Sequence, residues 1–253
     1  MLVSIAQFQL FFLVFTRVIA ILVQIPVFGA SAVPNQIKIG LAFVLSMVVM
    51  PWQPLPAEAE AMPWVLFAVG IGRELLVGIL AGFSASLVFG AFQIAGSLMD
   101  LSTGFSAGQM FNPALGEVGS SMSQFFSIMA ILYFLIINGH HSFLMGLQMT
   151  FTLLPVNQAL PELTYERLLI MTNGMILTGI QIAMPVLGAL LLTDLTLGLL
   201  SRVAPQIQVF FLGMPVKIWV GLIGLALAFG YLLPVIRDLL QNMGPRMLEI
   251  LGG

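Results

Sequence analysis

The sequence predicts an all-α fold, a membrane-associated bundle of bent helical hairpins with an irregular loop in the middle. Of the 253 residues, 60% are hydrophobic and only 7% are charged, whereas a soluble domain needs a polar exterior. Several uncharged stretches reach the ~20 residues of helix that cross a ~30 Å hydrocarbon layer. The glycine-rich stretch GFSAGQMFNPALGEVGSS, residues 104–121, then interrupts this apolar pattern. We therefore expect about six hydrophobic segments and one irregular loop between them.

Three of these segments are continuous enough to span a membrane. No Asp, Glu, Lys or Arg interrupts Leu75–Met99, Leu168–Thr193 or Ile218–Ile236. Each is therefore predicted to be a helix of membrane-spanning length.

The other three segments are less regular. Leu2–Phe28 is long enough but contains Arg17 and two glutamines. Ile39–Met50 is short, and the sequence PWQPLP follows it, where proline stops a helix. Phe125–Ile137 runs into the polar sequence NGHH. Such irregular helices indicate a backbone buried against other protein, because lipid cannot satisfy exposed backbone groups.

The first apolar segment is similar to a secretory signal, because the sequence ASA follows at residues 30–32. A signal would carry Lys or Arg before its apolar run, but the first basic residue is Arg17, inside the run. We therefore expect a retained helix. No Gly/Ser linker, charge block or low-complexity tract divides the chain, so we expect a single domain, residues 1–253.

Small residues recur every four positions in one predicted helix, at Gly78, Gly82, Ser86 and Gly90. Such a stripe lets the backbone of a second helix approach closely, where burial from water provides no driving force. The alternative is that glycine is simply common in membrane helices. We expect this small face to pack against another helix.

Five charged residues are expected to be buried with partners. Arg17, Asp194 and Lys217 lie inside or beside apolar segments, where an ionisable group is costly unless it is paired. Arg73 and Glu74 are interpreted as a pair at a segment boundary. For the two cations Arg17 and Lys217, the candidate partners within the chain are Glu74, Asp100 and Asp194.

Several classes of function lack support in the sequence. The net charge of −2 offers no basic surface for nucleic acid, and there is no cysteine. His140 and His141 are adjacent, so we expect them to point to different sides, and no HExxH metal motif occurs. No GxSxG elbow or P-loop is present either. We therefore expect no catalytic residues, no cofactor, no metal and no nucleic-acid partner.

The central stretch, residues 104–121, has the composition of a loop that can move. Its glycines give conformational freedom, and Asn112 followed by Pro113 marks a turn. Phe105, Met110 and Phe111 supply apolar bulk. A position facing lipid is excluded, because irregular backbone at membrane depth must lie against protein or a water-filled cavity. A plain connector between two helices is the alternative interpretation.

Four long phrases of the sequence together resemble one family, the FliR family of flagellar export-gate subunits. They are TRVIAILVQIPVFGASAVPNQIKIGLAFVLSMVVMP (16–51), RELLVGILAGFSASLVFGAFQIAGSLMDLSTGFSAGQMFNPALG (73–116), INGHHSFL (137–144) and SRVAPQIQVFFLGMPVKIWVGL (201–222). The last phrase is the most specific. It departs from the family at Gln208, where Asn is frequent, and a longer amide still donates and accepts hydrogen bonds.

The resemblance implies a role and an assembly. It implies a hetero-oligomer in which FliP-like, FliQ-like and FlhB-like subunits accompany this chain in the bacterial inner membrane, at the flagellar basal body. Unfolded secreted proteins would be the cargo of this type III secretion apparatus. The central loop would be the plug that occludes the closed pore, with gate residues Phe105, Gln109, Met110, Phe111, Asn112, Pro113 and Gly116.

The leading hypothesis is therefore a non-enzymatic subunit of the flagellar protein-export gate. Within the same family, an injectisome export-gate subunit is the alternative, and no sequence motif separates the two. From a different class, a secondary transporter for a small solute would also be apolar with broken helices. It should then contain an internal repeat, and none is evident.

Overall fold

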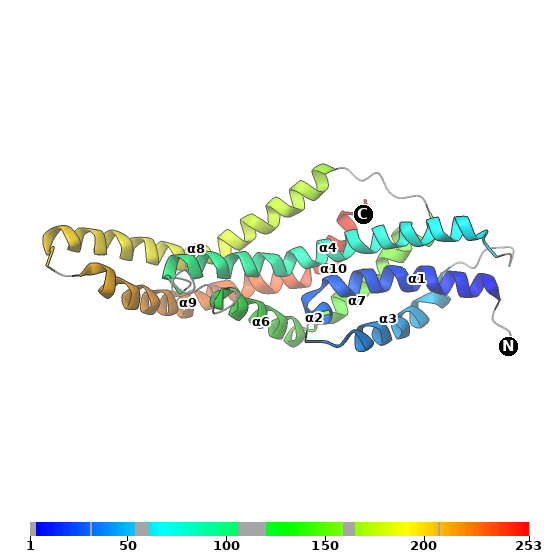
Figure 1. Cartoon of the computed structure of the whole chain (residues 1–253), viewed down its shortest axis with the longest axis horizontal. Coiled ribbons are helices and arrows are strands. Elements are labelled where there is room, and N and C mark those ends of the chain that lie inside the picture. Colours follow the sequence, from blue (N-terminus) through cyan, green and yellow to red (C-terminus); the bar gives the residue numbers. More distant parts are fainter. Residues whose placement is uncertain are drawn as a thin grey trace. The chain divides into compact units, whose positions relative to one another are not determined.

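The computed structural model describes residues 4–30, 32–53, 61–105, 120–158, 165–206 and 208–252. Within these ranges the chain forms helices joined by turns, without a strand, which confirms the all-α prediction (Figure 1). In chain order the elements are α1 (Ile5–Gln24), α2 (Pro26–Gly29), α3 (Asn35–Val49), the 3-10 turn η1 (Met50–Trp52), α4 (Trp64–Thr103), α6 (Ser121–Ile136), α7 (Gly139–Leu153), α8 (Tyr165–Val203), α9 (Val209–Gln241) and α10 (Met243–Glu249).

Four of these helices are long and apolar enough to cross a membrane. They are α1, α4, α8 and residues Phe211–Gln241 of α9. Helices α6 and α7 reach that length only as a broken pair, and α3 has 15 residues. The predicted hydrophobic segments thus correspond to four long helices, one broken pair and one short helix among the described residues, as expected for a membrane helical bundle.

The long helices extend well beyond the apolar windows that the sequence offered. Helix α4 has 40 residues and α8 has 39, so each is close to 60 Å long at ~1.5 Å per residue. Arg73 and Glu74 lie inside α4, and Asp194 lies inside α8. A hydropathy window ends at such a charge, whereas the helix continues because a buried partner or a polar surface can accommodate the side chain.

Residue contacts divide the chain into two compact units. Unit 1 comprises residues 1–88, 138–171 and 240–253, and unit 2 comprises residues 89–137 and 172–239. Three stretches far apart in the sequence therefore build unit 1. The expectation of a single domain stays a prediction.

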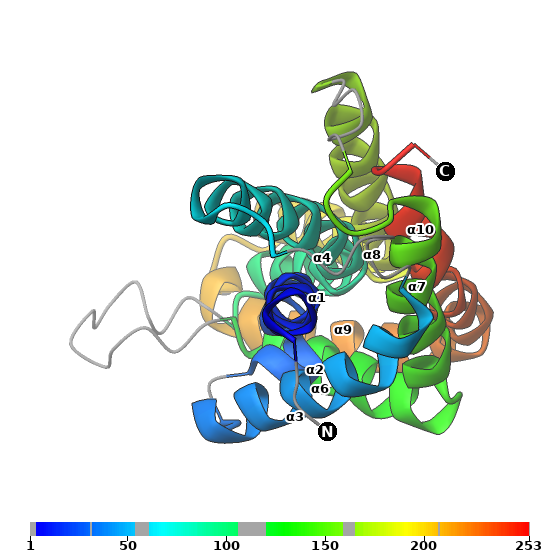
Figure 2. The ribbon, with the colours of Figure 1, turned by 90° about the vertical axis from the view of Figure 1, so that its right-hand side faces the viewer.

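Unit 1 is organised by two helix pairs. Helix α1 packs along α3, and α7 packs against α10 (Figures 1 and 2). Gly146 of α7 lies so close to α10 that a Cβ atom on it would be 2.7 Å from the Cα of Gly244. Because neither residue has a side chain, the two backbones can cross at this short distance. The fully buried side chains of α7 include Phe143 and Phe151.

Helix α4 packs closely on α1 within unit 1, at two of the predicted small positions. A Cβ atom on Gly78 would be 2.6 Å from the Cβ of Ala20 and 2.8 Å from the carbonyl oxygen of Arg17. A Cβ atom on Gly82 would be 3.1 Å from the Cα of Ile21. Real Cβ atoms essentially never come as close as 2.8 Å to backbone, so at position 78 only glycine permits this approach of the two helices, and at position 82 the contact would be tighter than most.

The other two small positions lie elsewhere. The hydroxyl of Ser86 donates to the carbonyl oxygen of Phe83 in its own helix, 2.8 Å away. In unit 2, a Cβ atom on Gly90 would be 2.6 Å from the sulfur of Met175 in α8. The stripe therefore does not meet a single partner helix: its first half lies against α1 and its last glycine against α8.

Unit 2 contains the end of α4, α6, and most of α8 and α9. The C-terminal part of α8 lies beside the start of α9 (Figure 1). The buried faces of α4 and α6 meet through aromatic rings, with the centroids of Phe89 and Phe134 separated by 5.8 Å. From α8, Ile182 and Val186 are fully buried. These residues form the apolar core of unit 2.

The polar sequence NGHH separates helix α6 from helix α7. Asn138 has a left-handed backbone with φ 57°, a conformation that asparagine tolerates better than most residues. Its carbonyl oxygen accepts a hydrogen bond from the amide of His141, 2.9 Å away. The prediction that NGHH interrupts the segment after Phe125 is confirmed.

Gly78→Leu should destabilise the protein, because a leucine side chain at this position would overlap the backbone of α1. Overpacking of this kind costs about 1–3 kcal/mol or more. We expect reduced accumulation in membranes and a lower melting temperature of the purified chain in detergent.

The matched control is Gly72→Leu in the same helix, where a Cβ atom would meet nothing within 4 Å. It adds the same apolar side chain and should leave the melting temperature close to that of the unmodified chain. Equal losses in the two variants would show that close packing on α1 is unimportant.

Candidate functional site

Most of the predicted gate residues lie outside the described residues. Gln109, Met110, Phe111, Asn112, Pro113 and Gly116 belong to residues 106–119, and only Phe105 is described. Their role as gate residues stays a prediction. The structure does describe both points at which this central loop is attached, within unit 2.

The first attachment point is the end of α4. The helix ends at Thr103, whose hydroxyl donates to the carbonyl oxygen of Met99 at 2.9 Å. Gly104 follows with φ 82°, and its amide donates to the carbonyl oxygen of Asp100 at 3.0 Å. A Cβ atom on Gly104 would meet nothing within 4 Å. Glycine is therefore favoured here by its left-handed backbone, which turns the chain out of the helix.

The second attachment point is the start of α6. The Ser120 hydroxyl accepts from the amide of Ser123 at 3.1 Å and so caps the helix. The hydroxyl of Ser123 in turn donates to the carbonyl oxygen of Gln93 in α4, also at 3.1 Å. A Cβ atom on Gly96 would be 2.7 Å from the carbonyl oxygen of Met122. The first turn of α6 is thus held directly against α4, which fixes both ends of the central loop.

An open pocket of about 450 Å³, lined by both apolar and polar residues, lies beside the first attachment point, in unit 2. Lys217 of α9 and Asp194 of α8 form a salt bridge in its wall. Their side chains are 25% and 50% exposed. Asp194, one of the three carboxylates expected as partners of the two cations, therefore neutralises Lys217 next to Gly104.

The second charged cluster is buried in unit 1. The Arg17 side chain of α1 is completely buried. Its Nε donates to Oε2 of Glu74 in α4 at 2.5 Å. Its Nη1 donates to the carbonyl oxygens of Thr150 at 3.0 Å and Leu154 at 2.7 Å. The ring of Phe151 lies against the guanidinium, with 4.3 Å between the ring centroid and Cζ of Arg17. Arg17 therefore binds the carbonyl end of α7, where the Thr150 oxygen also accepts from the amide of Leu154.

Glu74 extends this cluster to the segment after α7. Its Oε1 accepts a hydrogen bond from the amide of Asn157 at 3.1 Å. Asn157 has φ 66°, a left-handed backbone that asparagine tolerates. One ion pair thus joins α1, α4, the end of α7 and the turn that follows it. A buried charge of this kind is stabilised only because hydrogen bonds accompany the Coulomb attraction.

The interpretation of Arg73 and Glu74 as a boundary pair is wrong. Glu74 lies against Arg17, 57 residues earlier in the chain, and Arg73 has no salt bridge within the described residues. Neighbouring residues in a helix project in different directions, so Arg73 and Glu74 cannot both turn into the same contact. Arg73 is half-buried, whereas the side chain of Glu74 is 2% exposed.

Two glutamines of α1 have a role that the sequence analysis missed. Gln9 Nε2 donates to the carbonyl oxygen of Met62 at 2.9 Å, and the Met62 amide donates back to Gln9 Oε1 at 2.8 Å. Gln24 Nε2 donates to the carbonyl oxygen of Ile79 at 3.1 Å. Together with Arg17, these residues recur every seven or eight positions, which returns to one helix face. That spacing was the available signal for a polar face of α1 that contacts α4 and the residues just before it.

The histidine pair does not form a metal site with other residues in the described ranges. His140 and His141 lie in the first turn of α7, with their ring centroids 4.4 Å apart. The expectation that they point to different sides is therefore wrong, because the two rings lie against each other. No group of three or more His, Cys, Asp or Glu residues with metal-binding geometry occurs in the part of the chain that the structure describes.

Glu74→Ala should strongly destabilise the protein, because it leaves the buried Arg17 charge without its counter-ion. We expect a loss of about 3–5 kcal/mol in the free energy of unfolding, measured as a lower melting temperature in detergent. The double variant Arg17→Met with Glu74→Met removes both charges and should cost less than Glu74→Ala alone.

Asp194→Ala provides the matched control, because the partially exposed pair with Lys217 is screened by solvent. Its cost should be at most about 1 kcal/mol. If Asp194→Ala and Glu74→Ala lowered the melting temperature equally, burial of the Arg17 pair would not be the decisive factor.

The chain is similar in sequence to known bacterial export proteins. Residues 8–243 match the family described as "Bacterial export proteins, family 1". The flagellar biosynthetic protein FliR of Bacillus subtilis (strain 168) is 35% identical over 236 residues, which cover 91% of this chain and 90% of that protein. The FliR proteins of Pectobacterium carotovorum and Escherichia coli (strain K12) are 32% and 30% identical, over 95% and 96% of this chain and 90% and 91% of their own lengths. The chain therefore belongs to the FliR family of bacterial export proteins.

Proposed function

We propose that this chain is a subunit of the flagellar type III protein-export gate, where it helps to form and close the channel for unfolded flagellar proteins. The observation that carries this proposal is the similarity to FliR proteins over nearly the whole chain. These relatives are named as flagellar, which favours the flagellar apparatus over an injectisome. The role is structural and needs no catalytic residue.

The exposed apolar surface of α8 supports an assembly. Large hydrophobic side chains are exposed from Leu169 to Leu199, a distance of roughly 45 Å along the helix at ~1.5 Å per residue. This contour length exceeds the ~30 Å of a hydrocarbon layer, and α8 contains Pro185, so it is not a straight rod. We infer that lipid and other protein subunits share the cover of this surface.

The partners of this assembly are proposed from the family. FliP-like and FliQ-like subunits would share the bundle, and an FlhB-like subunit would dock beside it. The complex would lie in the bacterial inner membrane at the flagellar basal body. The four long apolar helices of this chain support a membrane location.

The attachment of the central loop supports a gate. One end leaves α4 through the left-handed Gly104, and the other enters α6 at the capped Ser120. Contacts of Gly96 and Ser123 hold the two helices together between these points. A loop on fixed ends can be displaced and can return without unfolding the helices that carry it. This property is what a plug requires during repeated export.

Gentle detergent extraction followed by mass spectrometry tests the assembly. We expect FliP-like, FliQ-like and FlhB-like subunits to co-purify with the chain. Deleting the gene should abolish motility and secretion of flagellar proteins. A chain that purifies only as a monomer, or a deletion strain that stays motile, would be strong evidence against an export-gate subunit.

Removing residues 108–116 should open the gate while the complex still assembles. The deletion takes away Met110 and Phe111, so a plug would no longer fill the pore. The expected result is leakage of ions or small molecules, measured with a potential-sensitive dye in cells and with dye-loaded vesicles.

Replacing residues 108–116 by a Gly/Ser sequence of the same length separates a plug from a connector. The replacement preserves the connection between α4 and α6 but removes the apolar bulk. A plug would leak in both variants, whereas a plain connector would be impermeable with the replacement. Normal impermeability of both assembled variants would refute the plug.

A further inference from the structure

An exposed apolar face runs along the first half of α4, in unit 1 (the cyan part of the helix in Figure 1). Its large side chains recur at the three- and four-residue spacing of one side of a helix. They are Val65, Val69, Leu75, Leu76 and Ile79, each between 42% and 75% exposed. From the first to the last, the stripe is roughly 21 Å long at ~1.5 Å per residue. This stripe, the α4 face, is left uncovered by the described part of the chain.

Arg73 lies at the edge of the α4 face. In a helix, the residues four before and three after a position lie beside it, and for Arg73 these are the exposed Val69 and Leu76. Gly70 and Val77, on its other side, are buried. The half-buried Arg73 side chain makes no salt bridge or hydrogen bond with another described residue. Its N–H donors therefore remain for whatever covers the face.

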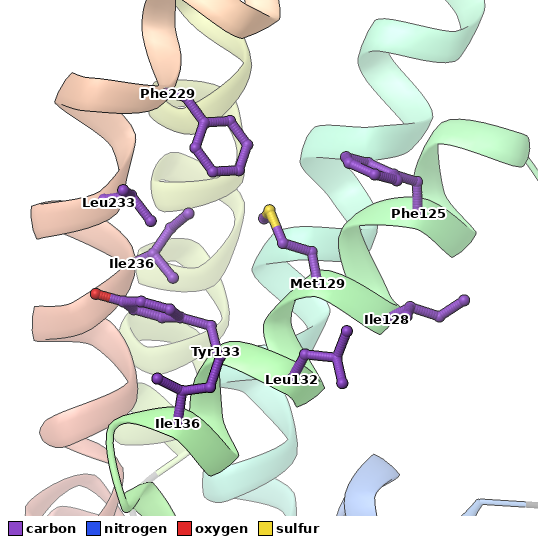
Figure 3. Close-up of a pocket in the computed structure, with 9 residues that line it drawn as sticks. All are labelled: Phe125, Ile128, Met129, Leu132, Tyr133, Ile136, Phe229, Leu233 and Ile236. Carbon is purple, nitrogen blue, oxygen red and sulfur yellow. The ribbon is translucent and has the colours of Figure 1, made fainter.

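A groove between α6 and α9 in unit 2 shows how little an apolar surface without a charge specifies (Figure 3). Nine side chains from the two helices line it, among them Phe125 and Phe229, and none is charged. Such a lining accepts any apolar occupant, because the hydrophobic effect has no direction. The α4 face differs from this groove, since Arg73 requires a partner of opposite charge.

The occupant of the α4 face must be apolar on both sides of an anionic group. Exposed apolar residues lie before Arg73, from Val65, and after it, up to Ile79. An occupant of this whole length meets apolar side chains, then the cation, then apolar side chains again. A phospholipid does not match this order, because its charge lies at one end and its acyl chains leave a cation unpaired. An apolar protein segment with one Asp or Glu in its middle does match, and a carboxylate accepts two parallel N–H bonds from a guanidinium.

The protein segment that fits is a helix. On an apolar surface a segment must satisfy its own backbone hydrogen bonds, and an α-helix does so along its whole length. Gly72 lies in the middle of the α4 face, and a Cβ atom on it would meet nothing within 4 Å. The lack of a side chain at this position lets the backbone of a second helix approach closely, beside Arg73.

We propose that the α4 face binds an apolar helix of a partner subunit, and that an Asp or Glu within this helix forms an ion pair with Arg73. The carboxylate lies within one helical turn, about 5.4 Å, of the level of Arg73. Arg17 has the same arrangement inside the chain, where the single carboxylate of Glu74 neutralises it. The contact belongs to the proposed export-gate assembly and rests on it.

Carbodiimide crosslinking of the Arg73→Lys variant tests the ion pair directly, in the complex purified with mild detergent. The reagent joins a lysine amine to a carboxylate in contact with it through an amide bond, with loss of water. Mass spectrometry should find position 73 linked to an Asp or Glu within an apolar segment of a co-purifying subunit. Lys217 and Asp194 form a salt bridge, so their link in the same sample shows that the reagent has worked.

Two results of the crosslinking would overturn the proposal. The first is an unlinked position 73 in a sample where Lys217 and Asp194 are linked. The second is a link from position 73 to a carboxylate of this same chain or of phosphatidylserine, because the charge would then have a different partner.

Arg73→Met tests the contact without a crosslinker, because it removes the charge and keeps a long apolar side chain. Retention of at least one co-purifying subunit, measured by quantitative mass spectrometry, should fall at least five-fold. The matched control Arg202→Met removes an exposed arginine from the last turn of α8 and should keep retention within two-fold. Arg73→Glu should lose the same subunit, and a lysine in place of the linked acid of that subunit should restore it. Unchanged retention in Arg73→Met would contradict the contact.

The melting temperature of the purified chain separates docking from folding. Arg73→Met should leave it unchanged, since the Arg73 side chain has no ion pair or hydrogen bond within the described residues. An unmodified chain that purifies without any subunit would refute the proposed function and this contact together. A complete complex that tolerates Arg73→Met and gives no link at position 73 would refute the contact alone.

Discussion

The buried ion pair of Arg17 and Glu74 is the interaction on which unit 1 depends. A guanidinium inside an apolar bundle must find a counter-ion and hydrogen-bond acceptors, since an uncompensated charge there is strongly unfavourable. Arg17 finds them in α4 and at the carbonyl end of α7, so its requirements fix where these two elements lie relative to α1. The glycines at positions 78 and 82 then let α4 approach α1 closely enough for the pair to form. The buried ion pair and the close packing of α4 on α1 therefore depend on each other.

Hydrophobic segments and buried charges could be predicted from the sequence, but their extents and partners could not. The windows around Leu75, Leu168 and Ile218 identify α4, α8 and α9 because long uncharged runs have few other uses. The windows end too early, since Glu74 and Asp194 are accommodated by partners that no window contains. Arg17 was identifiable as a costly charge, but three carboxylates were candidate partners and only the fold brings Glu74 to it. The glutamines of α1 were missed because a single polar residue in an apolar helix does not by itself indicate a contact.

The candidate gate was also predictable only in part. Its composition, rich in glycine with Asn112 and Pro113, predicts a loop from local rules alone. Its attachment depends on contacts between residues about 30 positions apart, such as Ser123 with Gln93, and sequence spacing says nothing about those. The groove between α6 and α9 was also invisible, because α6 shows an apolar face whether it meets a helix, a lipid or nothing.

The crossing of Gly146 and Gly244 also constrains the order of events during synthesis. Helix α7 is made about 90 residues before α10, an interval of roughly 5 to 18 seconds at ~5–20 residues per second. Throughout that interval the side of α7 around Gly146 has no α10 to cover it, although α1 and α4 already exist. The nascent chain must therefore tolerate a half-built unit 1 while residues 172–239 of unit 2 are being made. Any helper that protects this surface has to leave before α10 arrives, because two glycines separated by a backbone contact leave no room for a third chain.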